Sequence, residues 1–204
     1  MNDFRDKIKF MPNGRYKTNS QKAKDFPYYN MYEQDNSFVG RINPKYETRQ
    51  NKWLKGVSCF VVNKKGQILL ERRVSKGLTP GKIDLVSGHL DKEENSIQAM
   101  ERELQEEIGI KVKKENQLRT IGTLPLIFDN PKGKRKFKIE FFLCNYNNET
   151  INIQKDEVDN IFWLPMDEVF ELIRQGKTKF PYNEQMEEIF QKVNRSQNIG
   201  KERE

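Results

Sequence analysis

One amphipathic helix, set between blocks of β-rich sequence, constrains the fold of this chain more than any other feature. Four apolar residues recur at spacings of three and four, which place them in one stripe on a helix: Ile97, Met100, Leu104 and Ile108. Asn95 precedes the stripe as an N-cap, with Gln98 three residues later as in a capping box. Gly109 follows the stripe, where a left-handed C-terminal glycine belongs. The sequence therefore predicts a helix between Asn95 and Gly109.

β-rich runs lie on both sides of this helix. The predicted strands cover 57–62, 67–72, 83–87, 118–128, 136–146 and 161–164. The first two runs flank a glycine-containing turn and predict a hairpin. Two more helices are predicted near the end, one from Pro165 to Gly176 and one capped by Asn183. This order predicts an α/β fold with a mixed sheet.

The first quarter of the chain differs from the rest. Residues 1–50 hold nine aromatic residues, and ten Lys and Arg against six Asp and Glu. Because aromatic side chains bury large areas, we expect irregular structure with one or two short strands, packed on the main domain or on a partner subunit of a homodimer. Stacking of nucleobases is the alternative use. The predicted division is an extension over 1–50, a domain over 51–195 and a polar tail over 196–204.

The composition excludes several classes of site. With His89 as its single histidine, the chain has no material for a histidine-rich metal centre, and any Ser-His-Asp or Cys-His system would need that residue. Cys59 and Cys144 lie in strand-like runs, so we expect two buried free thiols. No apolar run approaches the roughly 18 residues of a membrane span, and the charged start is unlike a signal peptide. We expect a cytoplasmic protein without a membrane partner.

The net charge of +7 favours anionic partners such as nucleotides, phosphates or RNA, although a lysine-rich solubilising surface explains it equally well. A sharper signal is a group of three carboxylates, because Glu103, Glu106 and Glu107 share one helical face. Each like-charged pair weakens a helix by roughly 0.2–0.5 kcal/mol unless something neutralises it. A magnesium ion would do so and would bridge to substrate phosphates. The alternative is a solvated acidic face that Arg102 partly relieves.

The carboxylates belong to a longer pattern that resembles the Nudix box. It reads Gly-x5-Glu-x7-Arg-Glu-U-x-Glu-Glu-x-Gly-U, where U is aliphatic, and every defined position is matched between Gly88 and Ile110. The wider resemblance to a Nudix hydrolase covers about residues 52–195 and does not clearly reach residues 1–50. It implies an α/β/α sandwich around a mixed β-sheet, with an N-terminal extension.

The resemblance also implies roles for residues of the box. Glu103, Glu106 and Glu107 match the family's ligands for Mg²⁺, for which Mn²⁺ is an alternative, and the Gly88 carbonyl matches a further ligand. Glu103 or Glu106 matches the residue that serves as or orients the base for water. Three other residues match supporting positions: Arg102, which holds the glutamates, Glu94, which braces the loop, and Gly109, which ends the helix.

Residues outside the box are further candidates. Many relatives use an additional carboxylate, and both Glu140 and Glu157 resemble it, with Glu157 slightly preferred. Arg72 and Arg73 end the predicted hairpin and resemble the family's phosphate contacts, as does Lys76 in the next loop; strand alternation would aim only one of the two arginines at the site. His89 would contact substrate or accept a hydrogen bond within its loop.

The resulting functional prediction is metal-dependent hydrolysis of a diphosphate linkage in a nucleoside diphosphate derivative or nucleoside triphosphate. RNA 5′-end pyrophosphohydrolysis and a nucleotide-sensing module are alternatives. The stretch 80–89 also resembles isopentenyl diphosphate isomerase, but that enzyme needs several histidines and a catalytic cysteine ahead of the box. The substrate stays open: Pro125 has a spacing from the box reminiscent of ADP-ribose pyrophosphatases, and Trp53 or Trp163 would be able to stack a base.

Overall fold

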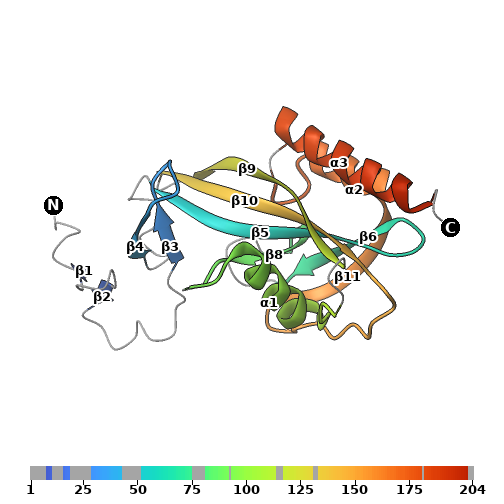
Figure 1. Cartoon of the computed structure of the whole chain (residues 1–204), viewed down its shortest axis with the longest axis horizontal. Coiled ribbons are helices and arrows are strands. Elements are labelled where there is room, and N and C mark those ends of the chain that lie inside the picture. The colour runs from blue at the N-terminus through green and yellow to red at the C-terminus, as the bar shows by residue number, and fades with distance from the viewer. Residues whose placement is uncertain are drawn as a thin grey trace.

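A computed structural model describes residues 8–10, 16–18, 29–42, 52–74, 81–91, 93–113, 117–130, 133–180 and 182–201. Its elements, shown in Figure 1, are β1 (Ile8–Phe10), β2 (Tyr16–Thr18), β3 (Tyr29–Tyr32), β4 (Phe38–Ile42), β5 (Trp53–Val62), β6 (Gln67–Arg73), β7 (Ile83–Asp84), β8 (Val86–His89), α1 (Ser96–Ile108), β9 (Leu118–Asn130), β10 (Gly133–Asn145), β11 (Val158–Pro165), α2 (Met166–Arg174) and α3 (Glu184–Lys201).

The sheet is mixed, as predicted. Its main path runs β11-β6-β5-β10-β9, with β3, β4, β7 and β8 joined to its flanks. β5 and β10 pair in parallel along their lengths, whereas β10 and β9 form a long antiparallel pair. β9 ends at Asn130 and β10 begins at Gly133, and these two residues are paired. Within the described residues, no helix is both long and apolar enough to cross a membrane.

The predicted hairpin is correct at its turn and wrong beyond it. Asn63 donates its backbone N–H to the Gln67 carbonyl at 3.0 Å, and Gly66 adopts a positive φ of 75°. However, β5 and β6 share only the pair Val62 and Ile68 before they separate. They separate because each strand takes other partners, β5 pairing with β8 and β10 and β6 with β7 and β11.

The segment predicted as one strand over 83–87 spans this separation. It is divided at Leu85, so that β7 pairs with β6 and β8 pairs with β5. Glu71 therefore lies opposite Asp84, and Gly56 lies opposite His89. The division fixes the entrance to α1 on β5, the central strand of the path.

Two apolar clusters pack on the two faces of the sheet, which gives the predicted α/β/α sandwich. One cluster joins alternate residues of β5, such as Phe60, to α2 and α3. The other joins the intervening residues, such as Cys59, to α1. Figure 1 shows α1 on one side of the sheet and α2 with α3 on the other. Alternation along β5 thus supplies both layers.

Helix α1 begins and ends as predicted, with the capping box of Asn95 and Gln98 and a left-handed Gly109 at φ 78°. One member of the predicted stripe is wrong, because Ile97 is 52% exposed. It lies in the first turn, ahead of Ala99, where the buried face begins. A glutamate, Glu107, completes that buried face instead.

The described residues of the N-terminal segment include four short strands, more than the one or two expected. β1 pairs with β2, and β3 pairs with both β4 and β5. Met31 is buried against Leu54 of β5 within the main core cluster. At the other end, Asn183 accepts a hydrogen bond from the Met186 N–H at 2.9 Å and caps α3 as predicted, and α3 continues to Lys201 into the segment assigned to the tail.

Candidate active site

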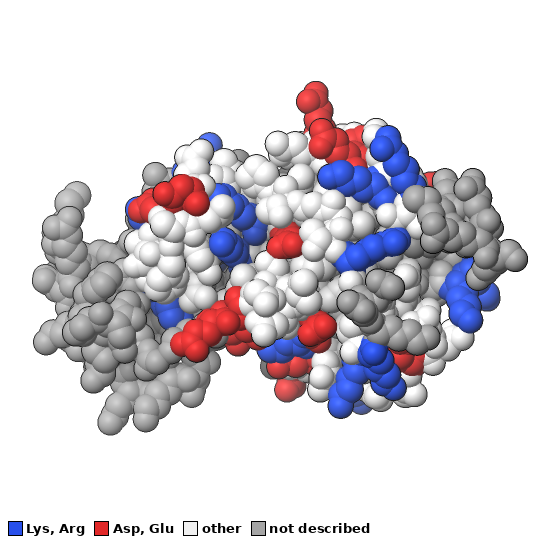
Figure 2. Space-filling view, in the orientation of Figure 1, with Lys and Arg blue, Asp and Glu red and all other residues white. Residues whose placement is uncertain are grey.

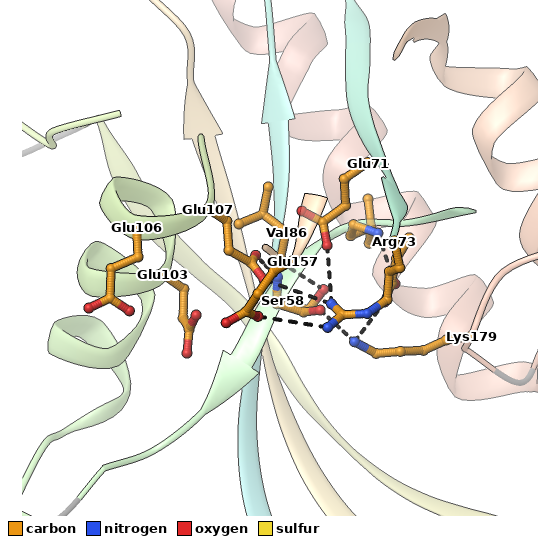
Figure 3. Close-up of polar contacts among 12 residues, drawn as sticks. Ser58, Glu71, Arg73, Val86, Glu103, Glu106, Glu107, Glu157 and Lys179 are labelled. Carbon is orange, nitrogen blue, oxygen red and sulfur yellow. Dashed lines mark hydrogen bonds and ion pairs between the residues drawn. The ribbon is translucent and has the colours of Figure 1, made fainter. Parts of the chain in front are cut away.

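Three glutamates of α1 leave the helix in different directions (Figure 3). Glu106 is largely exposed, with 53% of its side chain accessible. Glu107 is buried, and one carboxylate oxygen accepts the backbone N–H of Ser87 at 3.2 Å. Glu103 lies between these extremes, and its burial raises the pKa of its carboxyl group. The cluster therefore combines one solvated carboxylate with two that are costly to ionise without a nearby cation.

Gly88 and Glu103 are in close contact. A Cβ atom at Gly88 would lie 1.8 Å from Glu103 Oε1, which no real side chain tolerates. Glycine at this position lets the Glu103 carboxylate lie directly against the backbone of β8. The contact places a carboxylate beside the backbone of the glycine whose carbonyl oxygen is the predicted further ligand.

Arg102 joins this helix to the preceding loop. Its Nε and Nη2 donate to Glu94 at 2.8 and 3.1 Å, and Nη1 donates to Glu103 at 2.8 Å and to Glu106 at 3.1 Å. Nη2 also donates to the backbone carbonyl of His89 at 2.9 Å. Burial alone would raise the pKa of Glu94, but the hydrogen bonds from Arg102 outweigh it and hold that pKa below its usual value. Arg102 thus uses all five N–H donors of its guanidinium group.

A second charged cluster lies behind the helix, where β6, β7 and the segment after α2 meet. Glu71 and Asp84 are both fully buried. Lys179 Nζ lies 2.7 Å from Asp84 Oδ2 and also donates to the Ser87 hydroxyl. Burial, reinforced by the neighbouring Asp84, raises the pKa of Glu71 to about 8. Sequence reasoning missed all three residues, although acids at 71 and 84 within apolar strands are an available signal.

Arg73 connects the two clusters. Its Nη1 lies 3.4 Å from Glu71 Oε1 and 3.8 Å from Glu107 Oε1, and its Nη2 lies 3.8 Å from Glu157 Oε2 (Figure 3). Its neighbour on the strand, Arg72, is exposed and its guanidinium lies 4.9 Å from the centroid of the Phe162 ring. The structure thus brings Arg73 to the carboxylates and sets Arg72 apart. Lys76 lies outside the described residues.

The two candidate carboxylates beyond the box lie in different places. Glu157 reaches the cluster through Arg73, from the loop before β11. Glu140 instead accepts a hydrogen bond from the Thr120 hydroxyl at 3.1 Å across β9 and β10. Geometry therefore favours Glu157 as the additional carboxylate.

His89 lies in an aromatic stack. Its ring is 4.0 Å from that of Tyr29, with 9° between the planes, and 5.6 Å from that of Phe137. Burial, together with nearby Lys179 and Arg73, lowers the pKa of His89 to about 3, so the ring is neutral at pH 7. A neutral, packed imidazole suits a structural role. The backbone carbonyl of the same residue accepts a hydrogen bond from Arg102 and so helps to hold the loop before α1.

The cysteines are free and buried, as predicted. Burial raises the pKa of the Cys59 thiol well above its usual value. A buried thiol in the centre of β5 is unsuited to nucleophilic chemistry, so the arrangement does not favour the isomerase alternative.

The carboxylate oxygens of these glutamates are donors that suit a divalent cation. In this structure the glutamates contact arginine side chains. In the described parts of the chain, no three Asp, Glu, His or Cys side chains converge as metal ligands. Arg102 lies between Glu103 and Glu106, and Arg73 lies beside Glu107. The cradle at Gly88 and the buried Glu107 both offer oxygen donors, which Mg²⁺ and Mn²⁺ prefer.

Comparisons with known proteins concern the family and the fold of the chain. A family model described as the NUDIX domain matches residues 52–186. An uncharacterised Nudix hydrolase of Clostridium acetobutylicum is 29% identical over 149 residues, covering 70% of this chain and 71% of that protein. The NAD-capped RNA hydrolase NudC of Actinobacillus succinogenes is 29% identical over 115 residues, covering 54% of this chain and 40% of that protein. A crystal structure from Deinococcus radiodurans shares the fold with a TM-score of 0.59 and 19% identity, covering 79% and 96% of the two chains.

Proposed function

Because the chain belongs to the Nudix hydrolase family, we propose that it hydrolyses a diphosphate linkage in a nucleoside diphosphate derivative or nucleoside triphosphate, with Mg²⁺ or Mn²⁺ as cofactor. The observation that carries this proposal is the seat of Glu103 against Gly88, with Arg102 holding Glu103 and Glu106 together. This arrangement presents carboxylate oxygens on one turn of a helix beside the backbone of Gly88. Such a hard-oxygen set is suited to a divalent cation that also binds phosphate.

In the proposed mechanism, Glu103, Glu106, Glu107 and the Gly88 carbonyl would hold the cation. When bound, it would lower the pKa of a coordinated water and neutralise phosphate oxygens. Glu103, whose burial raises the pKa of its carboxyl group, would accept the proton as water attacks phosphorus. Arg102 would keep the glutamates in position, and Glu94 would keep Arg102 in position.

The second cluster would bind the substrate. Arg73 lies between Glu107 and Glu157, and its guanidinium group is of the kind suited to bidentate contact with a phosphate. Glu157 would orient Arg73 or assist with the water. Arg72 and His89 would contribute to substrate binding less directly. Arg72 lies at the strand end, and His89 would act through its packed ring and its carbonyl.

A screen of nucleoside diphosphate derivatives and triphosphates tests the proposal. We expect release of phosphate, pyrophosphate or a nucleoside monophosphate in Mg²⁺ and its loss in excess EDTA. Hydrolysis that continues unchanged in EDTA would contradict the metal mechanism. Failure of every diphosphate compound in both Mg²⁺ and Mn²⁺ would contradict the proposed activity.

An RNA 5′ end is a second candidate substrate, favoured by the likeness to the NAD-capped RNA hydrolase and by the basic, aromatic N-terminal segment. Binding through phosphate contacts would weaken steeply as salt is added. A capped RNA and the free dinucleotide therefore make a direct comparison. Equal turnover of the two at low salt would favour the small molecule. A nucleotide-sensing role without catalysis is less well supported, since every predicted metal-binding position of the box is present.

A further inference from the structure

A cavity of about 480 Å³ adjoins the proposed metal site. It lies between the β3–β4 turn, the start of α1 and strands β5, β9 and β10. Its lining residues are Asn36, Lys55, Gly56, Ser96, Thr123, Pro125, Lys138 and Glu140. The lining thus combines hydroxyl, amide and charged groups with two apolar residues, Gly56 and Pro125.

Gly56 connects the cavity to the carboxylates. It pairs with His89 across β5 and β8, and a Cβ atom on Gly56 would lie 3.0 Å from the Gly88 carbonyl oxygen. The same glycine, Gly88, is in close contact with Glu103. A molecule whose diphosphate lies at the metal site would thus extend naturally into this cavity.

Two lysines in the lining face each other. Lys55 and Lys138 are directly paired residues of the parallel strands β5 and β10. Like charges at such positions repel and destabilise a sheet. Burial, with added repulsion from Lys138, lowers the pKa of Lys55. Figure 2 shows basic side chains gathered beside the β3–β4 hairpin in this region. The pair is a cost to the fold that a bound anion would remove.

Neighbouring groups position the lysines without neutralising them. Lys55 Nζ lies 4.1 Å from the centroid of the Tyr32 ring, and Lys138 Nζ lies 5.5 Å from that of Trp53. Lys138 also donates to Asn36 Oδ1 at 2.9 Å. In the described part of the chain, neither ammonium group forms an ion pair with a carboxylate within 4.0 Å. Glu140 is the single acid of the lining, against two lysines.

The lining also indicates what the ligand is. It contains no aromatic ring among the described residues, so it offers no platform for a nucleobase. Instead, Ser96, Thr123 and Glu140 are suited to hydroxyl groups. We propose that Lys55 and Lys138 form a subsite for a further phosphate on a hydroxyl-bearing part of the substrate, separate from the diphosphate that is cleaved. That the ligand is a substrate rests on the proposed function. The presence of an anion site at Lys55 and Lys138 does not.

A binding experiment in EDTA tests the anion site independently of catalysis. Inorganic tripolyphosphate is titrated into the full chain while the backbone amide signals of Gly56 and Thr123 are followed by NMR. We expect both signals to shift, and Lys55→Gln to weaken the binding about tenfold or more, as loss of a charge-assisted contact does. Lys136→Gln is the control for loss of one nearby lysine charge, because Lys136 lies on the strand of Lys138 and over the same Trp53 ring but outside the lining. Absent shifts, or equal binding by Lys55→Gln, would overturn the inference.

A kinetic experiment then tests the link to substrate choice. Two matched pairs differ by one phosphate: NADP with NAD, and coenzyme A with its 3′-dephospho form. For the wild type we expect the phosphorylated member of at least one pair to have the higher kcat/KM, and Lys55→Gln to reduce that ratio while Lys136→Gln keeps it. A ratio that Lys55→Gln leaves unchanged counts against the subsite. If tripolyphosphate binds at Lys55 but the protein hydrolyses neither these compounds nor any other diphosphate, the proposed function alone is refuted.

Discussion

The ring of Tyr29 lies flat against the ring of His89, with centroids 4.0 Å apart. One residue comes from the N-terminal segment and the other from the strand that enters the Nudix box. The contact couples a part of the chain that the family model does not match to the backbone that supports Glu103.

Substitution Tyr29→Ala should therefore destabilise the whole domain. Loss of the stack and of a largely buried ring should lower the free energy of unfolding by about 1–3 kcal/mol. Urea unfolding followed by tryptophan fluorescence measures the change. Tyr182→Ala is the control, because Tyr182 is 44% exposed and should have little effect. Equal stability of Tyr29→Ala and wild type would show that the contact is incidental, as would an unchanged melting curve after deletion of residues 1–50.

Glu106→Gln should lower kcat about 100-fold or more, the scale on which loss of one group that stabilises transition-state charge acts. The fold should survive, because the Glu106 side chain is largely exposed. Circular dichroism and steady-state kinetics on the same preparation separate the two effects. Glu101→Gln, at an exposed position of the same helix, should retain wild-type turnover. Near-normal activity of Glu106→Gln would remove that residue from the mechanism.

Arg73→Lys should raise KM about tenfold, because lysine keeps the charge but loses the bidentate edge for phosphate. Arg72→Lys should change KM little, since the Arg72 guanidinium lies against Phe162 and apart from the carboxylates. The two adjacent variants make a matched pair in one kinetic assay. If Arg72→Lys has the larger effect on KM, the assignment of the two arginines is reversed.

His89 should make the protein less stable in acid. Its pKa is about 3 in the folded chain, against an ordinary value of 6.5. Between these pH values the unfolded chain binds a proton at His89 that the folded chain does not bind. The contribution of the neutral His89 to the stability of the fold is therefore complete above pH 6.5 and is lost as the pH falls toward 3. In His89→Phe that contribution is absent. The stability of the wild type relative to His89→Phe should thus decrease as the pH falls from 6.5 to 3, by at most about 1.4 kcal/mol per pH unit. A pH-independent difference would contradict the prediction.

Local signals in the sequence predicted the elements and the box well. The capping box, the left-handed Gly109 and the turn at Gly66 depend on neighbouring residues, and the structure has them where expected. The separation of β5 and β6 could not be predicted in this way. It depends on pairing with β8, β10 and β11, which are distant in sequence. The exposure of Ile97 likewise depends on which residues of α1 pack against the sheet, a face that begins at Ala99.

The candidate site divides along the same line. The motif located Glu103, Glu106, Glu107 and Arg102, whereas Glu71, Asp84 and Lys179 were missed. These three residues come together only because 83–89 spans the two separated strands and the segment after α2 returns beside Ile83. In the sequence, the available signal of this cluster is the presence of acidic residues within apolar strands, where they are buried.

Arg102 has no N–H group left with which to bind the substrate. Each of its N–H groups is already committed to Glu94, Glu103, Glu106 or the His89 backbone. In the proposed function, the negative charge of an incoming diphosphate would then be met by the metal ion and by cations on the strands, such as Arg73. Substrate recognition would then be separate from the scaffold that holds the glutamates, so substrate preference should be alterable at the strands without disturbing the helix.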